Sequence, residues 1–149
     1  MFGMFALKPN TPPEIRQFEG WFAASLATGI LVAILMYHEV IDEWGGPLEA
    51  AVVTIVLFGG AWGLMIWTSR FRSNLARWLL VVGSTVAVLP YLAHVSYLIA
   101  EEKTLYLSFL QAGLQWIAIY YLFTSGARAW FSGRPASLGG PAPPEEEPE

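Results

Sequence analysis

The sequence predicts an all-α membrane protein, a bundle of four transmembrane helices with both termini on the cytoplasmic side (N-in/C-in). Of its 149 residues, 55% are hydrophobic and 13% are charged, and the mean hydropathy is +0.48. Four apolar segments have the length of a membrane-crossing helix, and the basic residues fall almost entirely into alternate connections. Composition, segment length and charge placement therefore all favour a polytopic membrane protein over a water-soluble domain.

Each apolar segment is long enough to be a span. A hydrocarbon core about 30 Å thick requires roughly 17 to 25 residues of helix. The four predicted spans lie near residues 18–37, 48–67, 75–99 and 105–123.

The remaining sequence flanks a single predicted domain. We expect a transmembrane domain over residues 18–132 and a cytoplasmic or interfacial N-terminal segment over residues 1–17. Residues 133–149 are rich in Gly, Pro and Glu and contain too few apolar side chains to drive folding, so we expect a disordered cytoplasmic tail there.

The placement of the basic residues gives the orientation. Lys103 is the only basic residue that falls on the outer side. The positive-inside rule places the other seven in the cytoplasm, where they also suit contact with anionic lipid headgroups. These seven are Lys8, Arg16, Arg70, Arg72, Arg77, Arg128 and Arg134. Tryptophan prefers the headgroup region, and five tryptophans near span ends are expected to form aromatic belts: Trp21, Trp44, Trp67, Trp78 and Trp130.

Small residues are the predicted contacts between helices. Lipid offers no hydrophobic reward for helix association, so close packing depends on small side chains and on hydrogen bonds between helices. The first three spans each contain small residues four positions apart, on one helical face. The predicted packing residues are Ser25, Gly29, Gly59, Gly63, Gly83 and Ala87.

Polar residues inside the third and fourth spans are the candidate functional site. The predicted site comprises Tyr91, His94, Gln111 and Gln115. The turn at residues 100–104 is short, so we expect these spans to be antiparallel neighbours, with His94 opposite Gln111 and Pro90 opposite Gln115. A histidine inside a membrane is costly, and His94 is either a structural residue tethered by glutamine or a functional group.

Several kinds of chemistry lack a sequence signal. The chain has no cysteine, no nucleophile elbow, no phosphate-binding glycine loop and no clustered basic surface of the kind that binds nucleic acid. His38, Glu39, Asp42 and Glu43 are types that can bind a divalent ion, but a run of acids after a helix is more often a solvated loop. We expect no metal and no cofactor.

The end of the fourth predicted span carries a family resemblance. Tyr121-Leu122-Phe123-Thr124-Ser125, followed by Arg128-Ala129-Trp130-Phe131, resembles the endings of small uncharacterised bacterial inner-membrane proteins with four predicted spans. The resemblance implies a bacterial origin and the four-span layout. It implies no activity and no catalytic residue.

These observations favour a non-catalytic role. We expect an accessory or scaffold component of a complex in the cell inner (plasma) membrane, with the bilayer and either a larger complex or further copies of the chain as partners. One alternative is a small transporter or channel with a polar path around His94, Gln111 and Gln115. Another is a haem- or quinone-associated redox subunit using His94 and His38, although the two histidines are expected to lie at different depths.

Overall fold

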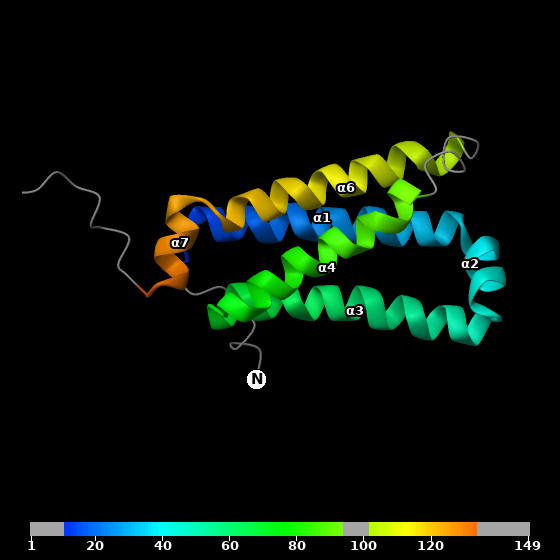
Figure 1. Ribbon diagram of the computed structural model, residues 1–149, viewed down its shortest axis with the longest axis horizontal. Coiled ribbons are helices and arrows are strands. Elements are labelled where there is room, and N and C mark those ends of the chain that lie inside the picture. The colour runs from blue at the N-terminus through cyan, green and yellow to red at the C-terminus, as the bar shows by residue number, and fades with distance from the viewer. Residues whose placement is uncertain (1–10, 94–101, 134–149) are drawn as a thin grey trace, which may run out of the picture.

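The computed structural model describes residues 11–93 and 102–133, with side chains described for residues 11–87 and 105–133. Every regular element in these ranges is a helix, which confirms the all-α prediction for this part of the chain. The helices, shown in Figure 1, are α1 (Pro13–Leu35), α2 (Tyr37–Trp44), α3 (Pro47–Phe71), α4 (Asn74–Ala93), α6 (Glu102–Leu122) and α7 (Ser125–Phe131).

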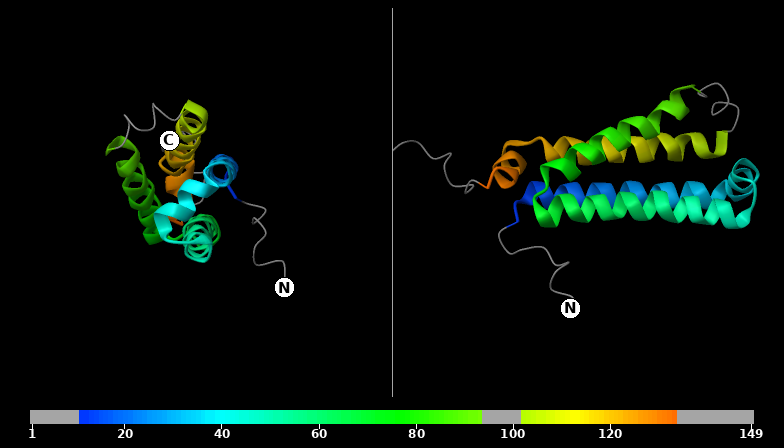
Figure 2. Two further views of the ribbon diagram at one scale, coloured as in Figure 1. Left: turned by 90° about the vertical axis from the view of Figure 1, so that its right-hand side faces the viewer. Right: turned by 60° about the horizontal axis from the view of Figure 1, so that its bottom comes forward.

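The four long helices alternate in direction. Helices α1 and α4 run toward the end of the molecule where α2 lies, and α3 and α6 run back toward α7 (Figures 1 and 2). The two ends are called the α2 end and the α7 end below. The first turns of α1 and α4, the last turns of α3 and α6, and the whole of α7 lie at the α7 end.

The first long helix begins earlier than expected. We expected the first span to begin near residue 18, after a cytoplasmic or interfacial segment, but α1 begins at Pro13. Proline suits the first helical position because the backbone N–H that it lacks would be unpaired there, and Glu14 places a negative charge at the positive end of the helix dipole. Residues 1–10 lie outside the described part of the chain.

The predicted outer connection at residues 38–47 contains a helix. Helix α1 ends at Leu35, Met36 makes the bend, and the eight residues of α2 follow. The acids of α2 are exposed whereas Val40 and Ile41 are half-buried, so this segment is amphipathic. Gly45, at φ 84°, ends α2 in the left-handed region that glycine adopts at little cost.

A two-residue link joins α3 to α4. Arg72 ends α3 at φ 53°, in the left-handed region. Ser73 then caps α4, because its Oγ accepts a hydrogen bond from the backbone N–H of Ala76 at 3.2 Å. The link reverses the chain at the α7 end and keeps Arg72 beside α7.

The hydrophobic core lies toward the α7 end. Helix α1 contributes one face of residues spaced three or four apart, and α3, α4, α6 and α7 close over it. The buried cluster comprises Ile15, Phe18, Phe22, Leu26, Met65, Leu80, Ala118, Ile119, Leu122, Ala127 and Trp130.

Helix α6 packs chiefly on α1. The short turn between the third and fourth spans predicted that these two would be close neighbours, but α4 packs more extensively on α3 than on α6. Figure 2 shows α4 crossing the bundle obliquely, from α3 at the α7 end toward α6 at the α2 end. A short turn fixes where two helices meet, whereas the angle between them follows from side-chain packing.

The outward surface is largely apolar. Large hydrophobic side chains are exposed on all four long helices, among them Ile34, Ile55, Val82 and Phe109. Within the described ranges two helices, α1 and α3, are long and apolar enough to span a membrane, and residues 74–87 of α4 form a shorter apolar stretch.

Candidate functional site

Two helices are joined in the interior by a serine. Ser25 on α1 is 2% exposed, and its Oγ donates a hydrogen bond to the backbone carbonyl of Gln111 on α6 at 3.1 Å. A carbonyl inside a helix has a second lone pair, so it accepts this bond without leaving its helical partner. The bond therefore ties α1 to α6 at no cost to either helix.

The side chain of Gln111 lies on the same part of α1. Gly29, one turn after Ser25, is buried, and a Cβ atom on it would stand 2.5 Å from Gln111 Nε2. Phe58 of α3 reaches the same place, since its Cε1 would be 2.9 Å from that Cβ. Ser25 and Gly29 thus lie at a helix contact, in agreement with their predicted packing role.

The second glutamine joins α6 to α4. Gln115 Nε2 donates a hydrogen bond to Ser84 Oγ at 2.7 Å, and Ser84 is 6% exposed. We expected Gln115 opposite Pro90, six residues later on the same helix. The expected pairing assumed that the axes of the two helices are parallel. Because α4 crosses the bundle obliquely, a different residue of α4 faces Gln115.

The structure therefore brings two of the four predicted site residues together. Gln111 and Gln115 are one turn apart on α6, and with Ser25 and Ser84 they form a set of polar residues that we call the polar interior. Tyr91 lies on α4 but its side chain is outside the described residues, as is the whole of His94. The chemistry of this set is that of neutral hydrogen-bonding groups.

The other predicted packing residues do not contact another helix in the part of the chain that the structure describes. A Cβ atom on Gly59, Gly63 or Gly83 would meet nothing within 4 Å, and Ala87 is exposed. Among the described residues, these four positions therefore lie at no contact between helices, and their packing role stays a prediction. Their faces of α3 and α4 point away from the other described helices because the core gathers around α1.

An ion pair at the α7 end was not predicted. Glu19 on α1 and Arg70 on α3 form a salt bridge, with side chains 14% and 15% exposed, and Arg70 also donates to Ser69 Oγ at 3.3 Å. We had expected His94 to be the ionisable side chain buried in a span. The signal was available, because Glu19 is an acid in the first turn of the predicted first span and antiparallel helices bring the start of α1 beside the end of α3.

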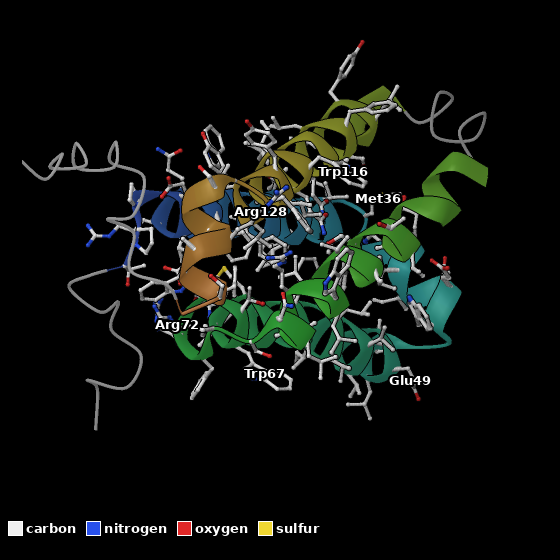
Figure 3. All side chains as sticks on the ribbon, turned by 60° about the vertical axis from the view of Figure 1, so that its left-hand side comes forward. Met36, Glu49, Trp67, Arg72, Trp116 and Arg128 are labelled. Atoms are coloured by element: carbon white, nitrogen blue, oxygen red, sulfur yellow. The ribbon has the colours of Figure 1, made fainter. Side chains whose placement is uncertain are left out.

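Arginines and aromatic rings meet at the same end. The guanidinium carbon of Arg72 lies 3.8 Å from the ring centre of Trp130, and that of Arg77 lies 4.4 Å from Phe123 and 5.2 Å from Phe131. Such cation–π contacts position a charge without neutralising it. Figure 3 shows Arg72 and Arg128 toward the α7 end and Glu49 toward the opposite end.

One predicted belt tryptophan is wrong. Trp21, Trp44, Trp67 and Trp78 are exposed as a belt requires, but Trp130 is 7% exposed and belongs to the core. It is buried because α7 folds back against the bundle and Arg72 covers its ring. The indole N–H of Trp130 has no hydrogen-bond partner among the residues that the structure describes.

The four metal-ligand candidates on α2 do not converge. His38, Glu39, Asp42 and Glu43 are all exposed on α2, and within residues 11–93 and 102–133 no three His, Asp or Glu side chains are grouped as metal ligands would be. His38 stacks edge-on against Tyr37, with ring centres 5.9 Å apart, at the outer surface of the bundle. The haem hypothesis needs His94 as the second ligand, which lies outside the described residues.

A shallow apolar groove lies at the α2 end. It runs between α1, α2 and α3 and is lined by residues that include Ile30, Ile34, Tyr37, Ala51 and Ile55. The groove is open to the surroundings of the protein and offers almost no polar atoms. It is therefore suited to apolar contacts rather than to bond-making chemistry.

Comparisons with protein families, with curated proteins and with solved structures found no match to this chain. The resemblance to small four-span bacterial inner-membrane proteins therefore stays a prediction.

Proposed function

We propose that this chain is a four-span inner-membrane protein, N-in and C-in, that acts as a non-catalytic accessory or scaffold component of a membrane complex. The apolar outward surface supports the membrane part of this proposal. A helix covers about 1.5 Å per residue, so the 20 to 25 residues of α1, α3, α4 and α6 reach roughly 30 Å, the thickness of a hydrocarbon core.

Charge at the two ends supports the orientation. Apart from Lys103 at the start of α6, the described basic residues gather at the α7 end, on the first turns of α1 and α4, the end of α3, and α7. Glu39, Asp42, Glu43 and Glu49 lie at the α2 end. The positive-inside rule then assigns the α7 end to the cytoplasm, and both described termini with it.

The paired state of the interior supports a structural role. Ser25 donates to the Gln111 carbonyl, Gln115 donates to Ser84, and the carboxylate of Glu19 is neutralised by Arg70. Groups that bond to each other across helices hold the bundle together. A catalytic base or nucleophile would instead be aimed at open space where a substrate can reach it.

The exposure of α3 is the observation that carries the scaffold role. Of its 25 residues four are buried, Ala50 near one end and Met65, Thr68 and Ser69 near the other. Its middle, residues 51–64, has no buried residue and contains Gly59 and Gly63 with open space above them. Close helix packing in a membrane depends on such small residues, so this face suits a helix of a partner protein.

The topology can be tested cleanly because the chain has no native cysteine. Single cysteines in place of Arg16 and Asp42, both exposed, report the two ends of the bundle. In intact cells a membrane-impermeant maleimide should label the cysteine at position 42 and not the one at position 16. Labelling of both positions would exclude the proposed orientation.

The scaffold role is tested by gentle solubilisation and affinity purification. We expect a stoichiometric partner with the native chain, loss of that partner with Gly59→Leu or Gly63→Leu, and its retention with Gly113→Leu, a glycine on α6 that is also open. A chain that purifies as a monomer with no partner would refute the proposal. Flux into liposomes that Gln115→Leu abolishes would instead support a transporter.

A further inference from the structure

We propose that Arg77 and Arg128 form a binding site for the phosphate of an anionic glycerophospholipid at the α7 end. The proposal rests on the membrane-spanning function above and adds a specific ligand to it. The two arginines come from different elements, the first turn of α4 and the middle of α7.

Arg77 is held in position by aromatic side chains. Its guanidinium carbon lies 4.4 Å from the ring centre of Phe123, 5.2 Å from Phe131 and 5.9 Å from Trp78. These rings fix the orientation of the planar guanidinium group, but they are weak acceptors for its N–H donors. Its Nε is buried and has no partner among the described residues. An arginine so placed is preorganised for an acceptor of matching planar geometry.

Arg77 and Arg128 are two positive charges without a carboxylate among the described residues to balance them in an ion pair. Arg77 lies 5.2 Å from the ring centre of Phe131, which stands one turn after Arg128 on α7, so the two positive charges are near each other and repel. Neither forms an ion pair with a carboxylate in the described part of the chain, since Glu19 is used by Arg70 and Glu14 lies against Gly126. An anion between the two guanidinium groups would replace this repulsion with charge-assisted hydrogen bonds.

The surroundings favour a lipid phosphate over a free one. Arg77 lies in the first turn of α4. In a membrane-spanning bundle this position is at the depth of the lipid headgroups. Beside Arg77 the exposed ring of Trp78 stacks edge-on against Phe123. That face of α6 continues through the exposed Tyr120 and Trp116, an apolar surface along which acyl chains can lie. A phosphodiester lipid with a net negative charge fits both the two arginines and the apolar surface beside them.

The purified, delipidated protein in detergent micelles provides the test. It is titrated with phosphatidylglycerol, with phosphatidylcholine of the same chains, and with inorganic phosphate. Binding is followed by native mass spectrometry and by the rise in melting temperature. We expect phosphatidylglycerol to bind and stabilise the native protein more than either of the other two ligands.

Variants locate the site. Arg77→Gln and Arg128→Gln should each weaken phosphatidylglycerol binding about tenfold, the effect of losing a charge-assisted hydrogen bond. Arg16→Gln, an exposed arginine of α1 at the same end, should leave binding unchanged. Arg128 is exposed and its variant should fold, so the test stands even if Arg77→Gln does not.

Three results would overturn the proposal. These are equal affinity of all variants for phosphatidylglycerol, equal stabilisation by phosphatidylcholine or by inorganic phosphate, and equal loss in the Arg16→Gln control. The lipid-binding measurement needs no partner protein, so a failed search for a complex would not contradict the lipid-site proposal. Conversely, a bundle with no lipid preference could still have a partner.

Discussion

The side-chain amide of Gln111 on α6 lies against Gly29 of α1, in the space that a Cβ atom would need. Nε2 of Gln111 would be 2.5 Å and Cε1 of Phe58 2.9 Å from such an atom. The Ser25 hydroxyl, one turn earlier, donates to the backbone carbonyl of the same glutamine. At this point of their interface, helices α1 and α6 therefore meet through two small residues of α1 and one polar residue of α6.

We predict that Gly29→Ala lowers the free energy of unfolding by about 1–2 kcal/mol. Overpacking costs about 1–3 kcal/mol, and alanine recovers part of this through its better helix propensity. The amide of Gln111 can turn aside, but the Phe58 ring must move as well. Chemical denaturation of the purified protein in detergent measures the change.

Gly83→Ala is the matched control. This glycine also lies within a helix, but a Cβ atom on it would meet nothing within 4 Å. Its substitution should leave the stability unchanged or raise it by up to about 1 kcal/mol. Equal destabilisation by the two alanines would show that the contact with Gln111 and Phe58 is not the cause.

We predict that Glu19→Gln and Arg70→Gln each destabilise the bundle by about 2 kcal/mol, between the values for exposed and fully buried pairs. Each change leaves one charge in a site that is only 14–15% exposed. The double variant should lose less than the sum of the two, because no uncompensated charge remains. Arg16→Gln, an exposed arginine on α1, should have little effect. Strict additivity in the cycle would argue against the ion pair.

A second double-mutant cycle tests the bond between Gln115 and Ser84. We expect Gln115→Leu and Ser84→Ala each to destabilise the protein and to show a coupling of about 0.6 kcal/mol, with an upper limit near 1.7 kcal/mol, as for other hydrogen bonds between membrane helices. The stabilities of the native chain, the two single variants and the double variant are measured by thermal unfolding in the same detergent. Absence of coupling would mean that the two side chains do not meet.

We predict that Gly126→Ala loosens α7. Thr124 stands at the N-cap but donates its hydroxyl to the Tyr121 carbonyl at 2.9 Å, so it does not cap α7. The carboxylate of Glu14 lies against Gly126 instead, at the positive end of the helix. A methyl group there displaces the carboxylate.

Hydrogen–deuterium exchange of residues 125–131 measures the effect on α7. Exchange should rise in Gly126→Ala and Glu14→Gln by an amount equivalent to about 0.3–1 kcal/mol. Gly113→Ala, at an open position on α6, should leave it unchanged. Unaltered exchange in Glu14→Gln would show that the carboxylate does not hold α7 in place.

The sequence by itself determined the helical class and the approximate position of each long helix. Apolar runs separated by charged or glycine-containing connections leave few other ways to satisfy the backbone, and helix formation is local. It also identified Gln111 and Gln115 as interior polar residues, and Ser25 and Gly29 as contact residues. In each case the inference needed only helical periodicity and the size or polarity of the side chain.

Only the tertiary structure decided which helices touch. Periodicity gives the faces of a helix but not its neighbours, so it could not show that α6 packs on α1, that Gln115 meets Ser84, or that Gly59, Gly63 and Gly83 face outward. The burial of Trp130 and the pairing of Glu19 with Arg70 likewise depend on helices that are distant in the chain. Crossing angles arise from the fit of many side chains at once, and no local pattern records them.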